Sequence, residues 1–272
     1  MKKAVGVIGG VGPMATVYYM QRVIEMTKAD CDQEHINMLV MNDCDIPDRT
    51  AFITEKSPEN PLPVMVEDAK RLEAAGCDFV VIPCNTAHYF YDELQHAVNI
   101  PVVNIVSETI RYAKAMTKDL KCVGILATTG TIVTGTYQKY AREAGLDAVI
   151  LNDDNQAKLM HIIYECVKAG KPVPRADFDE VANALRAQGA QVLILGCTEL
   201  SVLKRDLPIE EDDVLDSIDV LASETVRRSG KPWNEACLLK EYFYEEKKMV
   251  ACSDVVSGID ACNRLHGRWK HR

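Results

Sequence analysis

Short runs of apolar, mostly β-branched residues alternate with helical segments along most of the chain. We expect strands at residues 3–8, 37–41, 79–82, 102–105, 123–126, 148–151 and 192–195. Strands that alternate with helices in this way are typical of α/β folds. The pattern therefore predicts an α/β protein whose mainly parallel sheets are flanked by helices.

Proline and glycine mark the ends of the helices between these strands. Pro13 suits the first position of a helix, and Val17, Met20 and Ile24 recur on one face of that helix. Five glycines fall where helices are expected to stop, namely Gly76, Gly145, Gly170, Gly189 and Gly230. We therefore expect a separate helix to end near each of them.

The chain also contains a long-range repeat. Residues 8–12 correspond to residues 126–130, and the segment 82–86 with Cys84 corresponds to the segment 195–199 with Cys197. The two spacings nearly agree and are too long for a solenoid repeat. We therefore predict two similar α/β lobes that face one another.

The lobe boundaries follow from the strand pattern. The first lobe is expected to comprise residues 1–107 together with about 211–230, because the strand at 214–216 and the helix after it are expected to return to it. Residues 108–210 are expected to form the second lobe. The chain then changes in character, and residues 231–272 are interpreted as a C-terminal helical extension of unknown role.

Composition and charge exclude several classes of protein. A net charge of -9 over 272 residues removes the broad positive field that binders of nucleic acids or anionic membranes need. The longest apolar run stays well short of the roughly 18 residues of a membrane span. Glycines and Pro13 interrupt the first apolar stretch, so it is interpreted as a strand and not as a signal peptide. The ten cysteines are then best explained as reduced thiols of a cytoplasmic protein.

Two cysteines stand apart from the other eight, because Cys84 and Cys197 each end an apolar strand at matched points of the repeat. Ligands of α/β sheets bind beyond the carboxyl ends of strands, where the N-terminus of the next helix can lower the pKa of a thiol. The neighbouring Asn85, Thr86 and Thr198 can donate hydrogen bonds to a carboxylate. Two thiols across a cleft could remove a proton from one face of a carbon and return one to the other, which is racemisation.

These segments resemble a known family, the cofactor-independent aspartate/glutamate racemase superfamily, and most closely its aspartate racemase branch. Three motifs carry the resemblance: GGVGPMAT at residues 9–16, PCNTAH at 83–88 and GCTEL at 196–200. It spans about residues 3–230, and residues 233–272 depart from it. The resemblance implies two pseudo-symmetric lobes with the active site at their interface, a two-cysteine mechanism without pyridoxal phosphate, and a homodimer.

The resemblance also suggests partners for the side-chain carboxylate of an acidic substrate. By similarity to aspartate racemases, Arg49 would hold this carboxylate, and Lys168 would supply a second positive charge. A guanidinium matches a carboxylate with two parallel hydrogen bonds. Without the resemblance, Arg49 is simply a solvated loop residue, and Lys168 is a charge near a helix C-terminus.

Other residues have two open interpretations. The glycine-rich turn with Gly12 and Met14 is expected to let the backbone approach a small carboxylate. Three threonines after a strand of the second lobe are expected either to line the cleft or to cap a helix: Thr128, Thr129 and Thr131. His88 and Glu199 follow the two cysteines and are expected either to orient a thiol or to cap the first turn of a helix.

Other kinds of chemistry have weak support or none. Residues 10–15 match the dinucleotide pattern G-x-G-x-x-A, but Asp43 lies too far along the chain to be its acidic residue. The sequence has no P-loop, no G-x-S-x-G elbow and no cysteine or histidine spacing typical of a metal site. We therefore expect neither a cofactor nor a metal.

The sequence is interpreted as a racemase of an acidic amino acid, with aspartate as the first candidate substrate and glutamate as the second. Two alternatives remain open. One is a sister activity of the superfamily, of the hydantoin racemase or arylmalonate decarboxylase type. The other is a non-catalytic protein that binds an amino acid in the same cleft and acts as a regulator.

Overall fold

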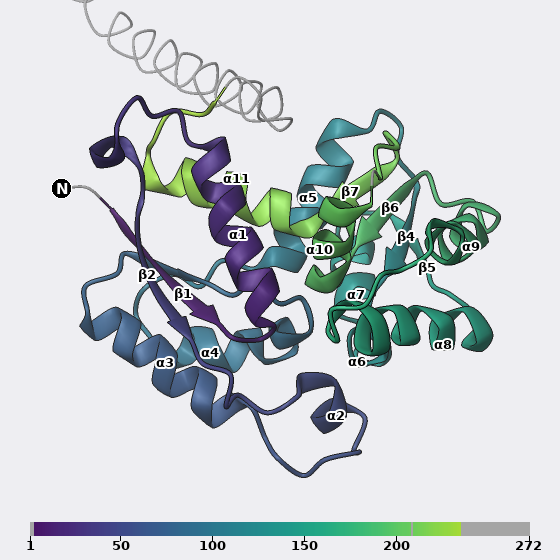
Figure 1. The fold of residues 1–272 in the computed structure, drawn as a ribbon, viewed down its shortest axis with the longest axis horizontal. Coiled ribbons are helices and arrows are strands. Elements are labelled where there is room, and N and C mark those ends of the chain that lie inside the picture. The colour runs from purple at the N-terminus through teal and green to yellow at the C-terminus, as the bar shows by residue number, and fades with distance from the viewer. Residues whose placement is uncertain (1–2, 208, 235–272) are drawn as a thin grey trace, which may run out of the picture. The chain divides into compact units, whose positions relative to one another are not determined.

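Two parallel sheets flanked by helices organise residues 3–207 and 209–234, which the computed structural model describes (Figure 1). The predicted fold class is confirmed. Of the extension expected at 231–272, only residues 231–234 lie within the described part. They run beside the end of the first helix, where the backbone N–H of Asn234 donates to the carbonyl of Met26 at 2.9 Å.

The first sheet has the strand order β2-β1-β3. Its strands are β1 (Ala4–Gly9), β2 (Asn37–Asn42) and β3 (Phe79–Val81). The accompanying helices are α1 (Pro13–Met26), α2 (Arg49–Ile53), α3 (Leu62–Ala74), α4 (Tyr91–Ala97) and α5 (Ile105–Met116), with short 3₁₀ turns at η1 (Asp32–Glu34) and η2 (Thr86–Phe90). Helix α3 packs against β1 and β3 and buries Leu72 and Met65 there.

The second sheet has the order β5-β4-β6-β7. Its strands are β4 (Cys122–Leu126), β5 (Asp147–Val149), β6 (Val192–Leu195) and β7 (Val214–Asp216). The accompanying helices are α6 (Thr129–Val133), α7 (Thr136–Glu143), α8 (Asp153–His161), the π-helix η3 (Ile162–Val167), α9 (Arg175–Arg186), α10 (Thr198–Asp206) and α11 (Ser217–Ser229).

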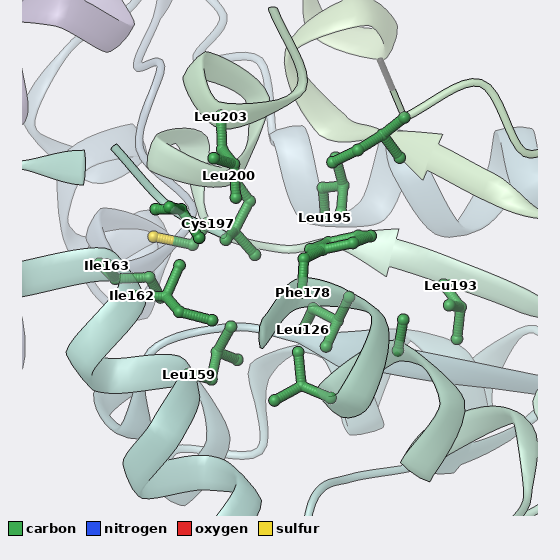
Figure 2. Packing of buried hydrophobic residues seen from close by; sticks show 14 of the residues in the cluster. Leu126, Leu159, Ile162, Ile163, Phe178, Leu193, Leu195, Cys197, Leu200 and Leu203 are labelled. Atoms are coloured by element: carbon green, nitrogen blue, oxygen red, sulfur yellow. The ribbon is translucent and has the colours of Figure 1, made fainter. Parts of the chain in front are cut away.

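Each lobe has its own apolar core, and each core ends at one of the two cysteines. Figure 2 shows Leu126, Leu195 and Phe178 packed together in the second lobe, with Cys197 at the edge of the cluster. Cys84 belongs to the corresponding cluster of the first lobe. Both cysteines therefore lie where an apolar core meets the space between the lobes.

The repeat predicted from the sequence is present in the topology. Strands β1, β2 and β3 occupy the same relative positions as β4, β5 and β6. The strand expected at 102–105 is reduced to a single parallel bridge between Val80 and Val102. This bridge lies beside β3, just as β7 lies beside β6.

The placement of residues 214–216 differs from our expectation. Strand β7 pairs with β6 of the second sheet, whereas we expected it in the first lobe. Its position beside β6 matches that of the Val102 bridge beside β3 in the first sheet. The helix that follows does cross over, since α11 packs against α1. In the opposite sense, α5 follows the first sheet and contacts α7 and β7 of the second. The lobes are thus joined by two exchanged helices.

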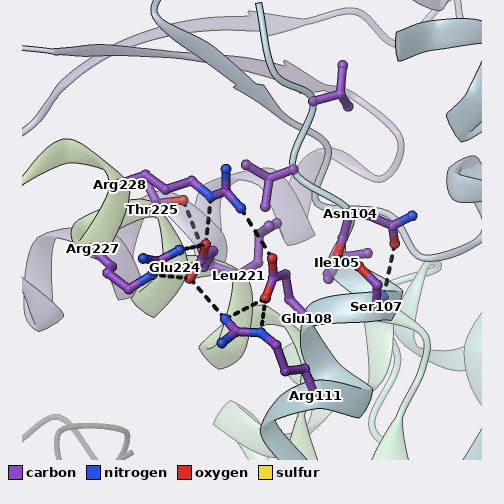
Figure 3. Close-up of polar contacts among 12 residues, drawn as sticks. Asn104, Ile105, Ser107, Glu108, Arg111, Leu221, Glu224, Thr225, Arg227 and Arg228 are labelled. Carbon is purple, nitrogen blue, oxygen red and sulfur yellow. Dashed lines mark hydrogen bonds and ion pairs between the residues drawn. The ribbon is translucent and has the colours of Figure 1, made fainter. Parts of the chain in front are cut away.

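Ion pairs join these two exchanged helices to each other (Figure 3). The fully buried Glu224 of α11 accepts hydrogen bonds from Arg227 and Arg228. Arg228 also reaches Glu108 of α5 at 3.2 Å, and Arg111 of α5 lies 3.6 Å from Glu224. A carboxylate without solvent needs such partners, so this network fixes α11 on α5.

Helix α1 begins at Pro13 as expected, but the face that carries Val17 and Ile24 is not its buried face. Val17 and Ile24 are 55% and 47% exposed. The buried side is formed instead by Tyr18, Tyr19, Val23 and Met26, together with small residues. The hydroxyls of Tyr19 and Thr225 lie 2.7 Å apart in the contact with α11, so the tyrosine is buried without losing its hydrogen bond.

The predicted helix ends are confirmed. All five glycines adopt left-handed backbone angles after a helix, with φ between 68° at Gly170 and 93° at Gly189. Within the described part of the chain, no helix is long and apolar enough to cross a membrane. The cysteines in that part are all free thiols.

Asp216 gives the fold a predicted dependence on pH. It caps α11, and burial, followed by the charge of Asp219, raises its pKa from 3.8 to about 6. A carboxyl whose pKa is higher in the folded state contributes stability below about pH 4, and this contribution is lost as the pH rises through 6.

Asp216→Asn should therefore gain stability relative to the wild type by up to about 3 kcal/mol as the pH rises from 4 to 7. Asparagine keeps the capping oxygen and removes the titration. Urea unfolding of both proteins at several pH values measures the difference, and the exposed Asp154→Asn controls for loss of an acidic side chain. A difference that stays constant over this range would contradict the assignment.

Candidate active site

Cys84 and Cys197 line the same cavity between the two lobes. Each follows a strand of its sheet, β3 or β6, so two strand ends of equivalent position bring the thiols together. The remaining lining residues are Val11, Asp48, Arg49, Thr50, Asn85, Thr86, Thr128, Tyr164, Lys168, Thr198 and Glu199. The cavity measures about 10 Å³, which is room for about one water molecule. An amino acid therefore needs more room than this structure offers, from movement of the lining side chains or from separation of the lobes.

Two glycines allow the lobes to approach this closely. A Cβ atom on Gly12 of the first lobe would lie 2.8 Å from Oε1 of Glu199 in the second. A Cβ atom on Gly130 of the second lobe would lie 2.9 Å from the hydroxyl of Thr50 in the first. Gly12 and Gly130 occupy matching turns of the repeat, so both lobes use the same device.

Cys197 is part of a buried chain of polar groups. Its Sγ donates to Oε2 of Glu199 at 3.0 Å, and Nζ of Lys168 lies 2.8 Å from Oε1 of the same carboxylate. Glu199 was expected either to orient a thiol or to cap α10, and the structure directs its side chain to the thiol of Cys197. Lys168 also lies over the ring of Tyr164, 5.2 Å from its centre.

The electrostatics of this chain follow from its burial. Burial alone would raise the pKa of Glu199, but Lys168 and Cys197 outweigh burial and lower it. Burial would lower the pKa of Lys168, but Glu199 raises it. Burial and Glu199 together raise the pKa of Cys197 well above its usual range. The lowering that we expected from the helix N-terminus is therefore absent at Cys197.

Arg49 begins α2 and is almost fully buried. Its Nη2 donates to the carbonyl of Val11 at 3.0 Å, and its Nη1 donates to that of Pro47 at 3.1 Å. The two terminal nitrogens, which were expected to bind a carboxylate, thus donate to the backbone, while Nε is buried without a hydrogen-bond partner. Burial would lower the pKa of Arg49, but Cys84 and Asp48 raise it. The site therefore holds a charged guanidinium whose Nε has no hydrogen-bond partner within the protein.

Sequence reasoning missed Val11, Asp48, Thr50 and Tyr164. The hydroxyl of Tyr164 in η3 donates to Oδ2 of Asp48 at 3.0 Å, and Asp48 also caps α2. The capping position of Asp48 could have been recognised from the sequence. Tyr164 lies one turn before Lys168, so the same helical face could have indicated it once Lys168 was a candidate.

Asn85 connects the turn of Cys84 to the second lobe. Its Oδ1 accepts from the hydroxyl of Tyr137 at 2.7 Å, and its Nδ2 donates to Ser217 at 3.0 Å. Ser217 in turn donates to the carbonyl of Leu195, at the end of β6. Asn85 lines the cavity, but these side-chain bonds are made within the protein.

Threonine hydroxyls from both lobes meet beside the cavity. The Oγ1 atom of Thr128 lies 3.1 Å from that of Thr50 and 3.0 Å from that of Thr86. Thr131 lies behind them, 2.9 Å from Thr86. Thr128 also caps α6, so the two functions considered for it occur together. These hydroxyls can exchange partners and donate to an incoming carboxylate.

His88 contacts the backbone of Cys84 and not its thiol. Its Nδ1 lies 2.8 Å from the carbonyl of Cys84, and the backbone N–H of Ile105 points to Nε2 at 3.3 Å. Burial lowers the pKa of His88 despite hydrogen bonds to the backbone. A neutral imidazole with a proton on Nδ1 satisfies both contacts, so His88 ties the Cys84 turn to α5.

Four other predicted residues lie outside the lining. Met14 is 52% exposed on α1 and does not line the cavity. Thr129 is directed to α8, where its backbone N–H contacts the sulfur of Met160. Gly12 lies next to the carboxylate of Glu199, and Thr131 lies within hydrogen-bond distance of Thr86; both of these neighbours line the cavity. In the described residues, no group of three or more His, Cys, Asp or Glu side chains is arranged to hold a metal ion.

Comparisons with known proteins identify the family of this chain. The family model described as Asp/Glu/hydantoin racemase matches residues 8–225. The broad specificity amino-acid racemase RacX of Bacillus subtilis (strain 168) is 26% identical over 234 residues, 82% of this chain and 96% of that protein.

Two solved structures are also similar. The aspartate racemase of Picrophilus torridus has a TM-score of 0.73 and 30% identity, covering 88% of this chain and 97% of that one. An aspartate racemase homologue from Pyrococcus horikoshii OT3 has a TM-score of 0.66 and 26% identity, covering 85% and 100%. The match of the family model over most of the chain shows that this protein belongs to the Asp/Glu/hydantoin racemase family.

Proposed function

We propose that this member of the racemase family interconverts the enantiomers of an acidic amino acid, aspartate first and glutamate second, by proton transfer between Cys84 and Cys197. The observation that carries the proposal is that the two thiols line one buried cavity from opposite lobes. Because β3 and β6 hold equivalent positions in the two sheets, the proposed approach of the thiols is from opposite faces of one carbon atom.

The reaction needs one thiolate and one thiol. The thiolate sulfur takes the proton from Cα, and the electron pair of the broken C–H bond stays on that carbon. The other thiol delivers its proton to the opposite face. The product then leaves one cysteine newly protonated and the other deprotonated, so the roles exchange for the reverse reaction.

The proton transfers alone do not explain the rate. A positioned acid and base each contribute about 10²- to 10⁴-fold, which is far less than the removal of an unactivated Cα proton requires. The cavity is buried, so its charged and hydroxyl groups act with little competition from water. The α-carboxylate is proposed to bind to backbone N–H groups and hydroxyls of Thr86 and Thr198, where it can stabilise the developing carbanion.

The side-chain carboxylate is proposed to bind Arg49 through its unpartnered Nε, with Lys168 as a second positive charge. The names of the relatives support an amino acid as substrate, since one is a broad specificity amino-acid racemase and another an aspartate racemase. Preference for an acidic substrate rests on the two cations that line this cavity.

We also propose that the chain is a cytoplasmic homodimer that needs no pyridoxal phosphate. The proposal rests on the motif resemblance and on the free thiols of the described residues. Light scattering should give twice the chain mass of 30.2 kDa, and a mass of one chain would contradict the dimer.

Cys84→Ser and Cys197→Ser should each lower racemisation of aspartate by about 10²- to 10⁴-fold, because a serine hydroxyl is too weak an acid to replace a thiol at neutral pH. Cys122→Ser, outside the cavity, is the matched control and should remain active. Circular dichroism checks that all three variants fold. Near wild-type rates in both Cys84→Ser and Cys197→Ser would refute the two-cysteine mechanism.

Arg49→Ala should reduce kcat/KM for aspartate by about 30-fold to several thousand-fold, because a desolvated carboxylate loses its charged partner. The loss should be much smaller for alanine or serine, if the enzyme accepts them. Steady-state kinetics of the wild type and the variant on both kinds of substrate measure this ratio. An equal loss on acidic and neutral substrates would show that Arg49 does not recognise the side-chain carboxylate.

A further inference from the structure

The two thiols have different charged neighbours. Cys197 points to the carboxylate of Glu199, whose other oxygen is held by Lys168. Cys84 lines the same cavity as Arg49, and it helps to raise the pKa of this guanidinium, which is fixed by backbone carbonyls. A negative charge beside a thiol opposes its ionisation, whereas a positive charge favours it. The pair is therefore unequal before any substrate binds.

The proton between Cys197 and Glu199 belongs on the sulfur. A free carboxyl group is a stronger acid than a free thiol by about four pKa units. Lys168 favours the charged form of the carboxylate still further, because it lies 2.8 Å from Oε1. The 3.0 Å contact is thus a thiol that donates to a carboxylate.

We propose that Glu199, held by Lys168, keeps Cys197 as the thiol in the resting enzyme and leaves Cys84, beside Arg49, as the thiolate that acts first. This inference rests on the proposed two-cysteine racemisation and assigns the role of each cysteine within it. Glu199 is a positioning residue in this account, since it acts on Cys197 and not on the substrate.

The surroundings of the pair agree with this assignment. Gly12 leaves just enough room for Glu199, because a Cβ atom there would lie 2.8 Å from its carboxylate. The other titratable groups near Cys197 are the phenols of Tyr137 and Tyr164, and burial raises the pKa of both, so they stay neutral. His88, beside Cys84, is also neutral, because burial lowers its pKa. The charged side chains that line the cavity are Glu199, Lys168, Arg49 and Asp48. Asp48 accepts from Tyr164 and caps α2, so Glu199 with Lys168 at Cys197 and Arg49 at Cys84 set the two thiols apart.

The assignment gives the reaction cycle a direction. The resting enzyme accepts the enantiomer whose Cα–H faces Cys84. After turnover Cys84 is a thiol, and Cys197 is a thiolate beside Glu199. The enzyme returns to rest when Cys197 takes a proton from solvent and Cys84 releases one. The opposite enantiomer must bind the rarer form, which raises its apparent KM. Because the enantiomers are equally stable, kcat/KM stays equal for both, and kcat differs by the same factor as KM.

The test is a titration of thiolate absorbance near 240 nm, which requires no turnover. The wild type, Cys84→Ser, Cys197→Ser and the control Cys122→Ser are compared between pH 6 and 10. Between pH 7 and 8 we expect Cys84→Ser to lose the absorbance of one thiolate and Cys197→Ser to lose none. Loss in Cys197→Ser alone, in both variants or in neither would overturn the assignment.

A second variant tests the part of Glu199. In a Cys84→Ser background, Glu199→Gln keeps the size of the side chain and removes its charge. The titration of Cys197 should then shift to lower pH by about 1 to 3 units, because Lys168 is released to favour the thiolate. An unchanged midpoint would show that Glu199 does not set the protonation of Cys197. If these titrations behave as expected but the wild type does not racemise amino acids, the proposed function fails and the assignment of protons stands.

Discussion

The site depends on the close contact of two lobes at their matched strand ends. Each sheet delivers one thiol beyond the end of an equivalent strand, and the thiols line one cavity because Gly12 and Gly130 let each lobe reach into the other. A side chain at either glycine would meet the opposite lobe at less than 3 Å. The arrangement of the reacting groups is therefore a property of the lobe interface and not of either lobe alone.

The exchanged helices maintain that contact. Helix α11 leaves the second sheet and packs on α1, while α5 leaves the first sheet and contacts α7 and β7. The buried Glu224 and its arginines connect α11 to α5, and Asn85 connects the Cys84 turn to α7 and α11. The same elements thus carry the stability of the interface and the position of the first cysteine. Because the cavity measures about 10 Å³, a substrate can enter in one of two ways: the lining side chains move, or this interface opens.

The sequence predicts those features that depend on local patterns. Buried strands such as β6 have uninterrupted apolar runs, helix ends have glycine, and the two cysteines stand at matched strand ends. Val17 and Ile24 have the helical period yet are exposed, because the buried side of α1 includes Tyr19, which contacts α11, far along the chain. Strand β7 was misplaced because its partner depends on topology. Contacts between distant residues, such as Tyr164 with Asp48 and Lys168 with Glu199, leave no local pattern to read.

In the proposed mechanism two different groups remove and deliver the proton, and isotope exchange can distinguish this from proton transfer by a single group. L-aspartate is incubated with the enzyme in D₂O and both enantiomers are analysed at low conversion. We expect the D-aspartate formed to carry deuterium at Cα while the remaining L-aspartate keeps its hydrogen, because one cysteine removes the proton and the other delivers the deuteron. Deuterium appearing in the remaining L-aspartate as fast as in the product would indicate a single base and refute the two-cysteine mechanism.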